Sequence, residues 1–85
     1  MYVHVGGDVM VPRARVIAIV NLAILDISPE THQFFDRMRA LDKVEGDLKH
    51  AKSMVILENG IYLSSISATT LARRGMRSLL PESAR

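Results

Sequence analysis

The stretch of the chain that decides the fold is residues 53–64, which read Ser53-Met54-Val55-Ile56-Leu57-Glu58-Asn59-Gly60-Ile61-Tyr62-Leu63-Ser64. Two apolar runs in it flank Asn59-Gly60, the preferred pair for a two-residue type I′ turn between antiparallel strands. We therefore predict a β-hairpin whose strands are Ser53–Leu57 and Ile61–Ser64. The remaining elements are predicted from the segments on either side of this hairpin.

The beginning of the chain predicts three further strands. Two short extended runs, Tyr2–Val5 and Val9–Val11, flank the turn Gly6-Gly7-Asp8, whose glycines tolerate positive φ, and this pattern indicates a tight hairpin. Pro12 ends the second run. The next segment, Arg15–Leu22, is rich in β-branched residues, which indicates a strand with two apolar faces.

Two helices are predicted, one before and one after the central hairpin. Ser28-Pro29 is typical of a helix start, because serine caps free N–H groups and proline suits the first helical position, so we expect a helix over Pro29–Asp42. Its apolar stripe is Phe34, Phe35, Met38 and Leu41. Val44–His50 is predicted as a polar loop. Ser67 is expected to cap a last helix, in which small and apolar residues recur at helical spacing: Ala68, Leu71, Ala72, Gly75, Met76 and Leu79.

The predicted element order, β-β-β-α-β-β-α, indicates an α+β domain with a small, mostly antiparallel sheet and two helices. The 85 residues provide for a single domain, which we assign to residues 1–80, followed by a short C-terminal tail of residues 81–85. A chain of this length has a thin stability margin. Without cysteine it cannot be stabilised by disulfides, so self-association is expected.

The apolar surface predicts an oligomer as well. Two helices can cover only one face of a five-stranded sheet, whereas the Arg15–Leu22 strand is apolar on both faces, so another subunit must cover part of this strand unless the loops do so. We therefore predict a homo-oligomer whose interface includes Val16, Ala18, Val20, Leu22, Arg73 and Arg77.

Catalytic and metal-binding motifs are missing from the sequence. It contains no cysteine, no nucleophile elbow, no phosphate-binding glycine loop and no zinc-protease motif, and its acidic residues form no acid–base pair. His4, His32 and His50 have no spacing that puts two metal ligands on one face. We therefore predict a protein that is not an enzyme and uses neither a cofactor nor a metal.

The sequence predicts neither secretion nor membrane insertion. Its beginning, Met1-Tyr2-Val3-His4-Val5, lacks the charged region and the long apolar region of a signal peptide. The longest uncharged apolar stretch, Val16–Leu25, is about ten residues long, well short of the roughly 20 residues of a membrane span. Together with the absence of cysteine, these features indicate a cytoplasmic protein.

Basic residues gather in two places, although the formal net charge is only +2. The clusters are Lys49, His50 and Lys52 before the central hairpin, and Arg73, Arg74 and Arg77 on the polar side of the last helix. Such clusters suit an anionic partner. For the arginines of the helix three explanations stay open: nucleic-acid phosphates, carboxylates of a neighbouring subunit, and favourable placement near a helix C-terminus.

Several segments, taken in order along the chain, carry a resemblance to a known family. They are Met1-Tyr2-Val3-His4-Val5-Gly6, Arg15-Val16-Ile17-Ala18-Ile19, Lys49-His50-Ala51-Lys52-Ser53, and Ile61–Ser65 leading to Ser67–Leu71. In their order and spacing, the chain from Met1 to about Met76 resembles the small RemA/RemB family of extracellular matrix regulatory proteins of Gram-positive bacteria.

This resemblance implies a non-enzymatic, cytoplasmic, DNA-binding transcriptional regulator of biofilm matrix genes, whose subunits form a ring with duplex DNA around its basic outside. The family's strand-start arginine corresponds to Arg15, and its basic turn corresponds to Lys49, His50 and Lys52. We add Arg13 as a further DNA-binding candidate. Strand-start arginines are commonly only solubilising edge charges, so these two arginines become phosphate ligands only if an oligomer lines them up with the basic turn.

One departure from the family pattern supports a second hypothesis. The RemA branch shows a pair of arginines where this chain has Lys49-His50, which lacks bidentate phosphate geometry and part of the charge. The alternative function is therefore an oligomeric scaffold that co-assembles with a RemA-like regulator and binds little DNA itself. A small-molecule sensor has no supporting motif and would require a pocket at a subunit interface.

Overall fold

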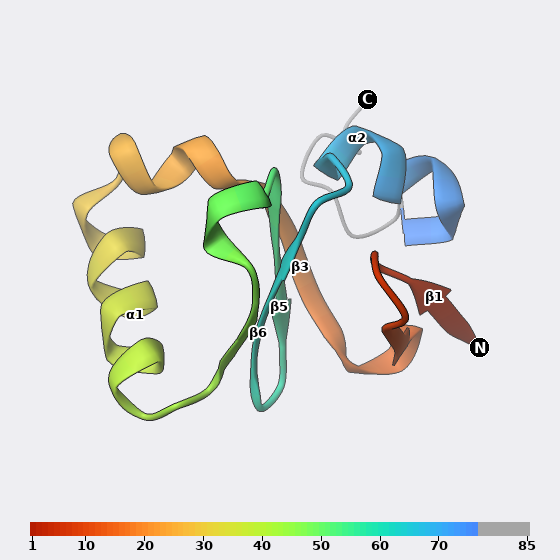
Figure 1. The fold of residues 1–85 in the computed structure, drawn as a ribbon, viewed down its shortest axis with the longest axis horizontal. Coiled ribbons are helices and arrows are strands. Elements are labelled where there is room, and N and C mark those ends of the chain that lie inside the picture. The colour runs from red at the N-terminus through yellow and green to blue at the C-terminus, as the bar shows by residue number, and fades with distance from the viewer. Residues whose placement is uncertain (77–85) are drawn as a thin grey trace.

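The computed structural model describes residues 1–76 of the chain, and these residues form an α+β domain (Figure 1). Its strands are β1 (Tyr2–His4), β2 (Met10–Pro12), β3 (Val16–Asn21), β4 (Val44–Gly46), β5 (Ser53–Leu57) and β6 (Gly60–Ser64). Its helices are α1 (Pro29–Ala40) and α2 (Ala68–Leu71), with 3₁₀ turns η1 (Arg13–Arg15), η2 (Leu22–Asp26) and η3 (Leu48–His50) and a π turn η4 (Ala72–Met76). The predicted fold class is confirmed, while the end of the predicted domain and the predicted tail, residues 77–85, lie outside the described residues.

The strands form two sheets. A four-stranded sheet has the order β3-β5-β6-β4, and β1 pairs with β2 in a separate antiparallel hairpin. Within the larger sheet β3–β5 and β5–β6 are antiparallel, whereas β4 runs parallel to β6. The predictions of a mostly antiparallel sheet and of an N-terminal hairpin are therefore confirmed, although the hairpin is not part of the main sheet.

Strand β4 lies within the segment that we predicted as a polar loop, so that prediction was wrong. The strand contains one apolar residue, and it pairs with a segment that follows much later in the chain, so the local pattern carries no strand signal. A close backbone approach makes the pairing possible, since the Lys43 carbonyl accepts the Ile61 N–H at 2.9 Å. Gly46 has a φ of +102°, and a Cβ on it would lie 2.3 Å from the Leu63 carbonyl oxygen, so only glycine fits there.

The turn of the central hairpin differs from the prediction by one residue. Leu57 pairs with Gly60, so the two turn residues are Glu58 and Asn59 rather than Asn59 and Gly60. A type I′ turn requires positive φ at both central residues, and neither has it here. Gly60 instead allows a close approach, because a Cβ there would lie 2.7 Å from the Lys43 carbonyl oxygen.

The main sheet is covered on both faces by other parts of the same chain (Figure 1). Helix α1 covers one face, where Phe35 packs with Met54, Ile61 and Leu63. The β1–β2 hairpin and α2 cover the other face, and the core residues there are Val3, Val5, Val11, Val16, Ile19, Val55 and Leu71. Our premise that one face stays open was wrong, because β1 and β2 lie over the sheet and not in it. The two apolar faces of β3 therefore give no argument for an oligomer.

Both predicted helix starts are confirmed. Ser28 Oγ accepts the Thr31 N–H at 3.2 Å, and Ser67 Oγ accepts the Thr70 N–H at 3.2 Å. Each serine thus satisfies one of the N–H groups that a helix start leaves without an intrahelical partner.

The helix ends differ from the prediction. Helix α1 ends at Ala40, earlier than predicted, and Asp42 then adopts a φ of 60° that turns the chain away. Leu41 is consequently 57% exposed and does not belong to the apolar stripe. Helix α2 changes to a π turn after Leu71, and the predicted helical position Leu79 lies outside the described residues.

Two fully buried serines tie the sheet to the segments that cover it. Ser53 Oγ donates to the Ile66 carbonyl at 2.7 Å. Ser64 Oγ donates to the Val5 carbonyl at 2.6 Å and accepts the Ile66 N–H at 3.0 Å. These bonds satisfy backbone groups that burial would otherwise deprive of water.

Replacing Ser64 with alanine is expected to lower the free energy of unfolding by about 1–3 kcal/mol, because the buried Val5 carbonyl loses this hydrogen bond. Urea unfolding followed by circular dichroism measures the loss. Ser65→Ala, at the exposed neighbouring position, is the matched control and is expected to cost less than about 0.5 kcal/mol. Equal losses in the two variants would show that the Ser64–Val5 bond contributes nothing.

Candidate nucleic-acid interface

Three of the predicted DNA-binding residues lie on one exposed loop, residues 47–52, which we call the basic loop. Asp47 caps its 3₁₀ turn: one carboxylate oxygen accepts the Lys49 N–H at 3.0 Å, and the other accepts Nδ1–H of His50 at 2.5 Å. Lys49, His50 and Lys52 are all exposed to solvent. The structure therefore brings these three residues together, as the sequence predicted.

The base of the basic loop is fixed by the backbone of Lys52. Its N–H donates to the Ser64 carbonyl at 2.7 Å, and its carbonyl accepts the Leu22 N–H at 3.1 Å. These bonds hold the loop between the end of β6 and the start of η2. The basic side chains are thus presented from a defined position at one end of the sheet.

Asp47 is a residue of the candidate site that we did not single out from the sequence. The hydrogen bond from His50, followed by that from the Lys49 N–H, lowers the pKa of the Asp47 carboxyl below its ordinary value. The carboxylate is therefore ionised at neutral pH and offsets part of the positive charge of the basic loop. An aspartate placed before a short turn with a basic residue three positions later was the signal that could have identified this pair.

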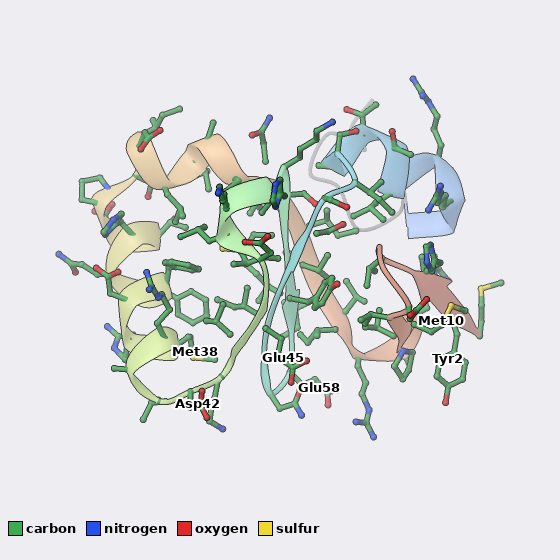
Figure 2. All side chains as sticks on the ribbon, in the orientation of Figure 1. Tyr2, Met10, Met38, Asp42, Glu45 and Glu58 are labelled. Carbon is green, nitrogen blue, oxygen red and sulfur yellow. The ribbon has the colours of Figure 1, made fainter. Side chains whose placement is uncertain are left out.

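Arg15 lies at the opposite end of the sheet from the basic loop. It belongs to the 3₁₀ turn η1 and not to the strand, so the predicted strand start at this residue was wrong. Its carbonyl accepts the Glu58 N–H at 3.1 Å. Figure 2 labels Glu58 at the lower end of the β5–β6 hairpin, whereas the green turn with the basic loop lies at the upper end (Figure 1). Six residue steps, or about 20 Å of extended chain, separate Lys52 from Glu58.

Arg13 shares the turn η1 with Arg15, and its side chain is half-buried. Its backbone N–H donates to the Met1 carbonyl at 2.9 Å, which joins η1 to the start of β1. Within one chain, the structure does not bring Arg13 or Arg15 to the basic loop. Their part in DNA binding stays a prediction that depends on a second copy of the chain.

The arginines of the last helix have a different setting. Arg73 and Arg74 are exposed on η4, and a guanidinium nitrogen of Arg74 lies 3.5 Å from Nδ1 of His4. Arg74 therefore faces the N-terminal hairpin of its own chain. Arg77 lies outside the described residues, so its predicted interface role, like that of Arg73, stays a prediction.

The predicted apolar interface residues are covered within the chain. Val16 is buried in the core beneath the β1–β2 hairpin. Val20 and Leu22 are half-buried against the core beneath α1, and Ala18 is also half-buried. Their role in self-association stays a prediction. Packing within the chain is a second explanation for why these residues are apolar.

An open groove of about 600 Å³ lies beside the basic loop. Its lining comes from separate segments of the chain, so the sequence pattern gave no sign of it: Asn21, Leu22, Ala23, Leu25, Asp26, Leu48, Ala51, Lys52 and Ser67. Leu48 projects next to the basic side chains and is 42% exposed. The basic loop therefore borders a groove whose lining mixes apolar and polar side chains.

The three histidines lie apart, each with a local partner. Nε2 of His4 contacts the Gly7 carbonyl at 2.7 Å, Nδ1 of His32 lies 3.0 Å from Asp36, and Nδ1 of His50 lies 2.5 Å from Asp47. Among residues 1–76, no group of three histidine, aspartate or glutamate side chains is placed to hold a metal ion.

No helix in residues 1–76 is long and apolar enough to cross a membrane.

Comparison with known proteins identifies one family. The model of the RemA-like family, described as extracellular matrix regulatory protein A-like, matches residues 2–74. Of the elements in residues 1–76, this range includes all the strands, α1, α2, η1 and the basic loop. A search of curated proteins finds no match.

Proposed function

This chain belongs to the RemA-like family of extracellular matrix regulatory proteins, and we propose that it regulates matrix genes by binding duplex DNA in the cytoplasm. The proposed activity is binding alone, with no catalysed reaction, metal or cofactor. The observation that carries the proposal is the basic loop, where Lys49, His50 and Lys52 project from a backbone fixed at one end of the sheet.

The chemistry of the basic loop favours phosphates over bases. Lysine is a compact point charge that neutralises a phosphate and releases counterions, and this contribution does not depend on sequence. The aromatic residues of the chain, Tyr2, Phe34, Phe35 and Tyr62, all lie outside the loop, so it offers no platform for stacking unpaired bases. Any sequence preference would therefore come from DNA shape and bendability.

A single loop of this kind binds weakly, and repetition in an oligomer would compensate for this. Closed homo-oligomers repeat the same surface around an axis, and several linked contacts bind far more tightly than one. We propose a homo-oligomer, in the form of a ring, that presents many basic loops to one duplex. Within the family we propose the RemB branch and a role in biofilm matrix regulation, on the resemblance of the chain as a whole.

The Asp47–His50 pair favours one alternative function. Asp47 binds Nδ1 of His50 and adds a negative charge to the loop. The loop therefore offers a phosphate less positive charge and fewer hydrogen-bond donors than its three basic residues suggest. The alternative is an oligomeric scaffold that co-assembles with a RemA-like paralogue and has little affinity for DNA.

Replacing Asp47 with asparagine is expected to tighten duplex DNA binding about threefold at low salt, because it removes a competing anion from the loop. An asparagine oxygen can still accept the Lys49 N–H, so the turn is retained. Fluorescence anisotropy with a labelled duplex measures the change. Asp36→Asn, which removes the same charge from exposed α1, is the control and is expected to leave affinity unchanged. Unchanged affinity in Asp47→Asn would contradict a phosphate-binding role for the loop.

The test of the proposed function is duplex DNA binding by the wild-type protein as a function of salt, on a sample whose mass is determined by light scattering. We expect binding that weakens steeply with salt, with a logarithmic slope beyond about −2, since each phosphate contact contributes about −0.9. An assembled wild-type protein that ignores DNA even at low salt would overturn the proposal and favour the scaffold.

A further inference from the structure

The imidazole ring of His50, on the basic loop, has a partner at one of its two nitrogen atoms. Nδ1 lies 2.5 Å from a carboxylate oxygen of Asp47. Among residues 1–76, no group forms a hydrogen bond with Nε2. The side chain of His50 is 70% exposed, so Nε2 is accessible to a ligand from solvent.

Asp47 determines which ring nitrogen carries the hydrogen when the imidazole is neutral. The hydrogen bond from His50, followed by that from the Lys49 N–H, lowers the pKa of the Asp47 carboxyl, so this carboxylate is ionised near neutral pH. An ionised carboxylate only accepts hydrogen bonds, and Nδ1 must therefore be the donor. A neutral imidazole has one N–H group, so Nε2 of neutral His50 has a lone pair and no hydrogen.

The protonation state of the ring therefore decides whether it can bind a phosphate. The oxygens of a DNA phosphodiester are acceptors at neutral pH, and an unprotonated Nε2 offers them no donor. A second proton makes Nε2 a donor and gives the ring a positive charge, and charge-assisted hydrogen bonds are roughly twice as strong as neutral ones. Histidine is the residue type that gains this charge between about pH 5 and 8.

We propose that His50 binds a DNA phosphate through Nε2 when its ring carries two protons, so that DNA binding by the basic loop takes up a proton and weakens from pH 6 to pH 8. The step is a proton equilibrium in which one proton moves from solvent to Nε2. Asp47 remains the acceptor at Nδ1 throughout. The proposal rests on the proposed function and adds a regulation of the same site by pH.

The charges around His50 make its protonation count. Asp47 contacts Nδ1, so a phosphate at Nε2 binds the opposite side of the ring from this carboxylate. The other charged side chains of the surrounding segments are Lys49 and Lys52 on the loop, Asp26 on η2, which lines the groove with Lys52, and Arg39 and Asp42, which line a second pocket that shares Leu48 with the groove. With a neutral ring these three cations and three anions, Asp47 included, cancel. One added proton therefore makes the region positive.

Histidine is the residue of the basic loop whose charge follows pH near neutrality, because lysine stays charged below about pH 10. The tighter binding expected for Asp47→Asn is accordingly a result for pH 8, where histidine is neutral in both proteins. Toward pH 6 this gain is expected to shrink, because an asparagine attracts a charged imidazole less than a carboxylate does.

The proposal is tested by measuring duplex DNA affinity at pH 6 and pH 8, at one salt concentration, by fluorescence anisotropy. We expect the wild-type protein to bind about tenfold more tightly at pH 6, since one phosphate contact contributes about a decade. His50→Gln cannot gain the charge, and its affinity is expected to change by less than about threefold between the two pH values. His50→Arg is charged at both and is expected to bind tightly at both.

The matched control is His32→Gln. His32 also pairs with an aspartate, since its Nδ1 lies 3.0 Å from Asp36, but this exposed pair is on α1 and not on the basic loop. His32→Gln is therefore expected to keep the tenfold response to pH. Circular dichroism at both pH values checks that each variant is folded. In His50→Gln, Asp47 can still accept the Lys49 N–H, so the turn is retained.

A second measurement needs no change to the site. Isothermal titration calorimetry of the wild-type protein with duplex DNA at pH 7.5, in two buffers with different heats of ionisation, measures the protons taken up on binding. We expect a net uptake, of at most one proton for each basic loop that contacts DNA. His32→Gln is expected to give the same uptake, and His50→Gln is expected to give none.

The outcomes separate this proposal from the proposed function. A response to pH that His50→Gln abolishes and His32→Gln keeps supports both. If wild type binds duplex DNA equally well at pH 6 and pH 8 without proton uptake, or if His50→Gln responds to pH as wild type does, the role of His50 is overturned and the proposed function stands. If the assembled wild-type protein ignores DNA at pH 6 and low salt, both are overturned.

Discussion

Replacing Lys49 and Lys52 together with alanine is expected to weaken duplex DNA binding about 100-fold at 0.1 M salt. Each phosphate contact contributes about one decade at this salt concentration, and its loss makes the salt dependence shallower by about one unit of slope. The variant is expected to keep its fold and mass, because the hydrogen bonds that shape the loop use the backbones of these two residues. Fluorescence anisotropy at several salt concentrations measures both effects.

The matched control for this variant is Arg37→Ala/Lys43→Ala, which removes the same charge from exposed positions on and just after α1. We expect the control to change affinity by less than about threefold, because charges far from the contact act only through a screened field. Equal losses in the two double variants would mean that net charge alone drives binding, and that the basic loop is not the site.

Replacing Phe35 with alanine is expected to lower the free energy of unfolding by about 3–5 kcal/mol. Phe35 is 2% exposed and packs between α1 and the sheet, and its ring also lies 5.6 Å from the Arg39 guanidinium. A domain of this length has a total stability on the order of 4–13 kcal/mol, so the variant loses a large part of it. Urea unfolding by circular dichroism measures the loss.

Phe34→Ala is the control for this prediction, since Phe34 is the same residue type on the same helix but only half-buried. It is expected to cost less than half as much, because the cost follows the apolar area removed and the cavity left behind. A Phe34 variant as unstable as the Phe35 variant would contradict the assignment of Phe35 as the centre of the core beneath α1.

Elements of the fold that depend on residues close to one another in the sequence were predictable. Ser28 and Ser67 each cap the helix that follows them, and glycines at the first turn supply the positive φ that it needs. Strand β4 was not predictable in this way. Its pairing depends on Lys43 approaching Ile61, and on Gly46 approaching Leu63, across residues that are distant in the chain. Contacts of this kind leave no periodic pattern in a three-residue segment.

The candidate site was predictable only in part, for the same reason. The basic loop is local, so its three basic residues could be grouped from their order alone. The distance between Arg15 and Lys52 depends on both ends of β3 pairing with the full length of β5, which local patterns do not define. Asp47 was missed because an aspartate before a turn is common, so its spacing from His50 was a weak signal until the structure showed the hydrogen bond between the two side chains.

The most direct test of the central claim is amide hydrogen–deuterium exchange of the full-length protein with and without duplex DNA, read by mass spectrometry. DNA contact at the basic loop is expected to slow exchange in peptides that cover residues 47–52, while exchange in α1 stays the same. Slowed exchange at η4 or α1, with residues 47–52 unchanged, would contradict the account and place the DNA contact elsewhere on the molecule.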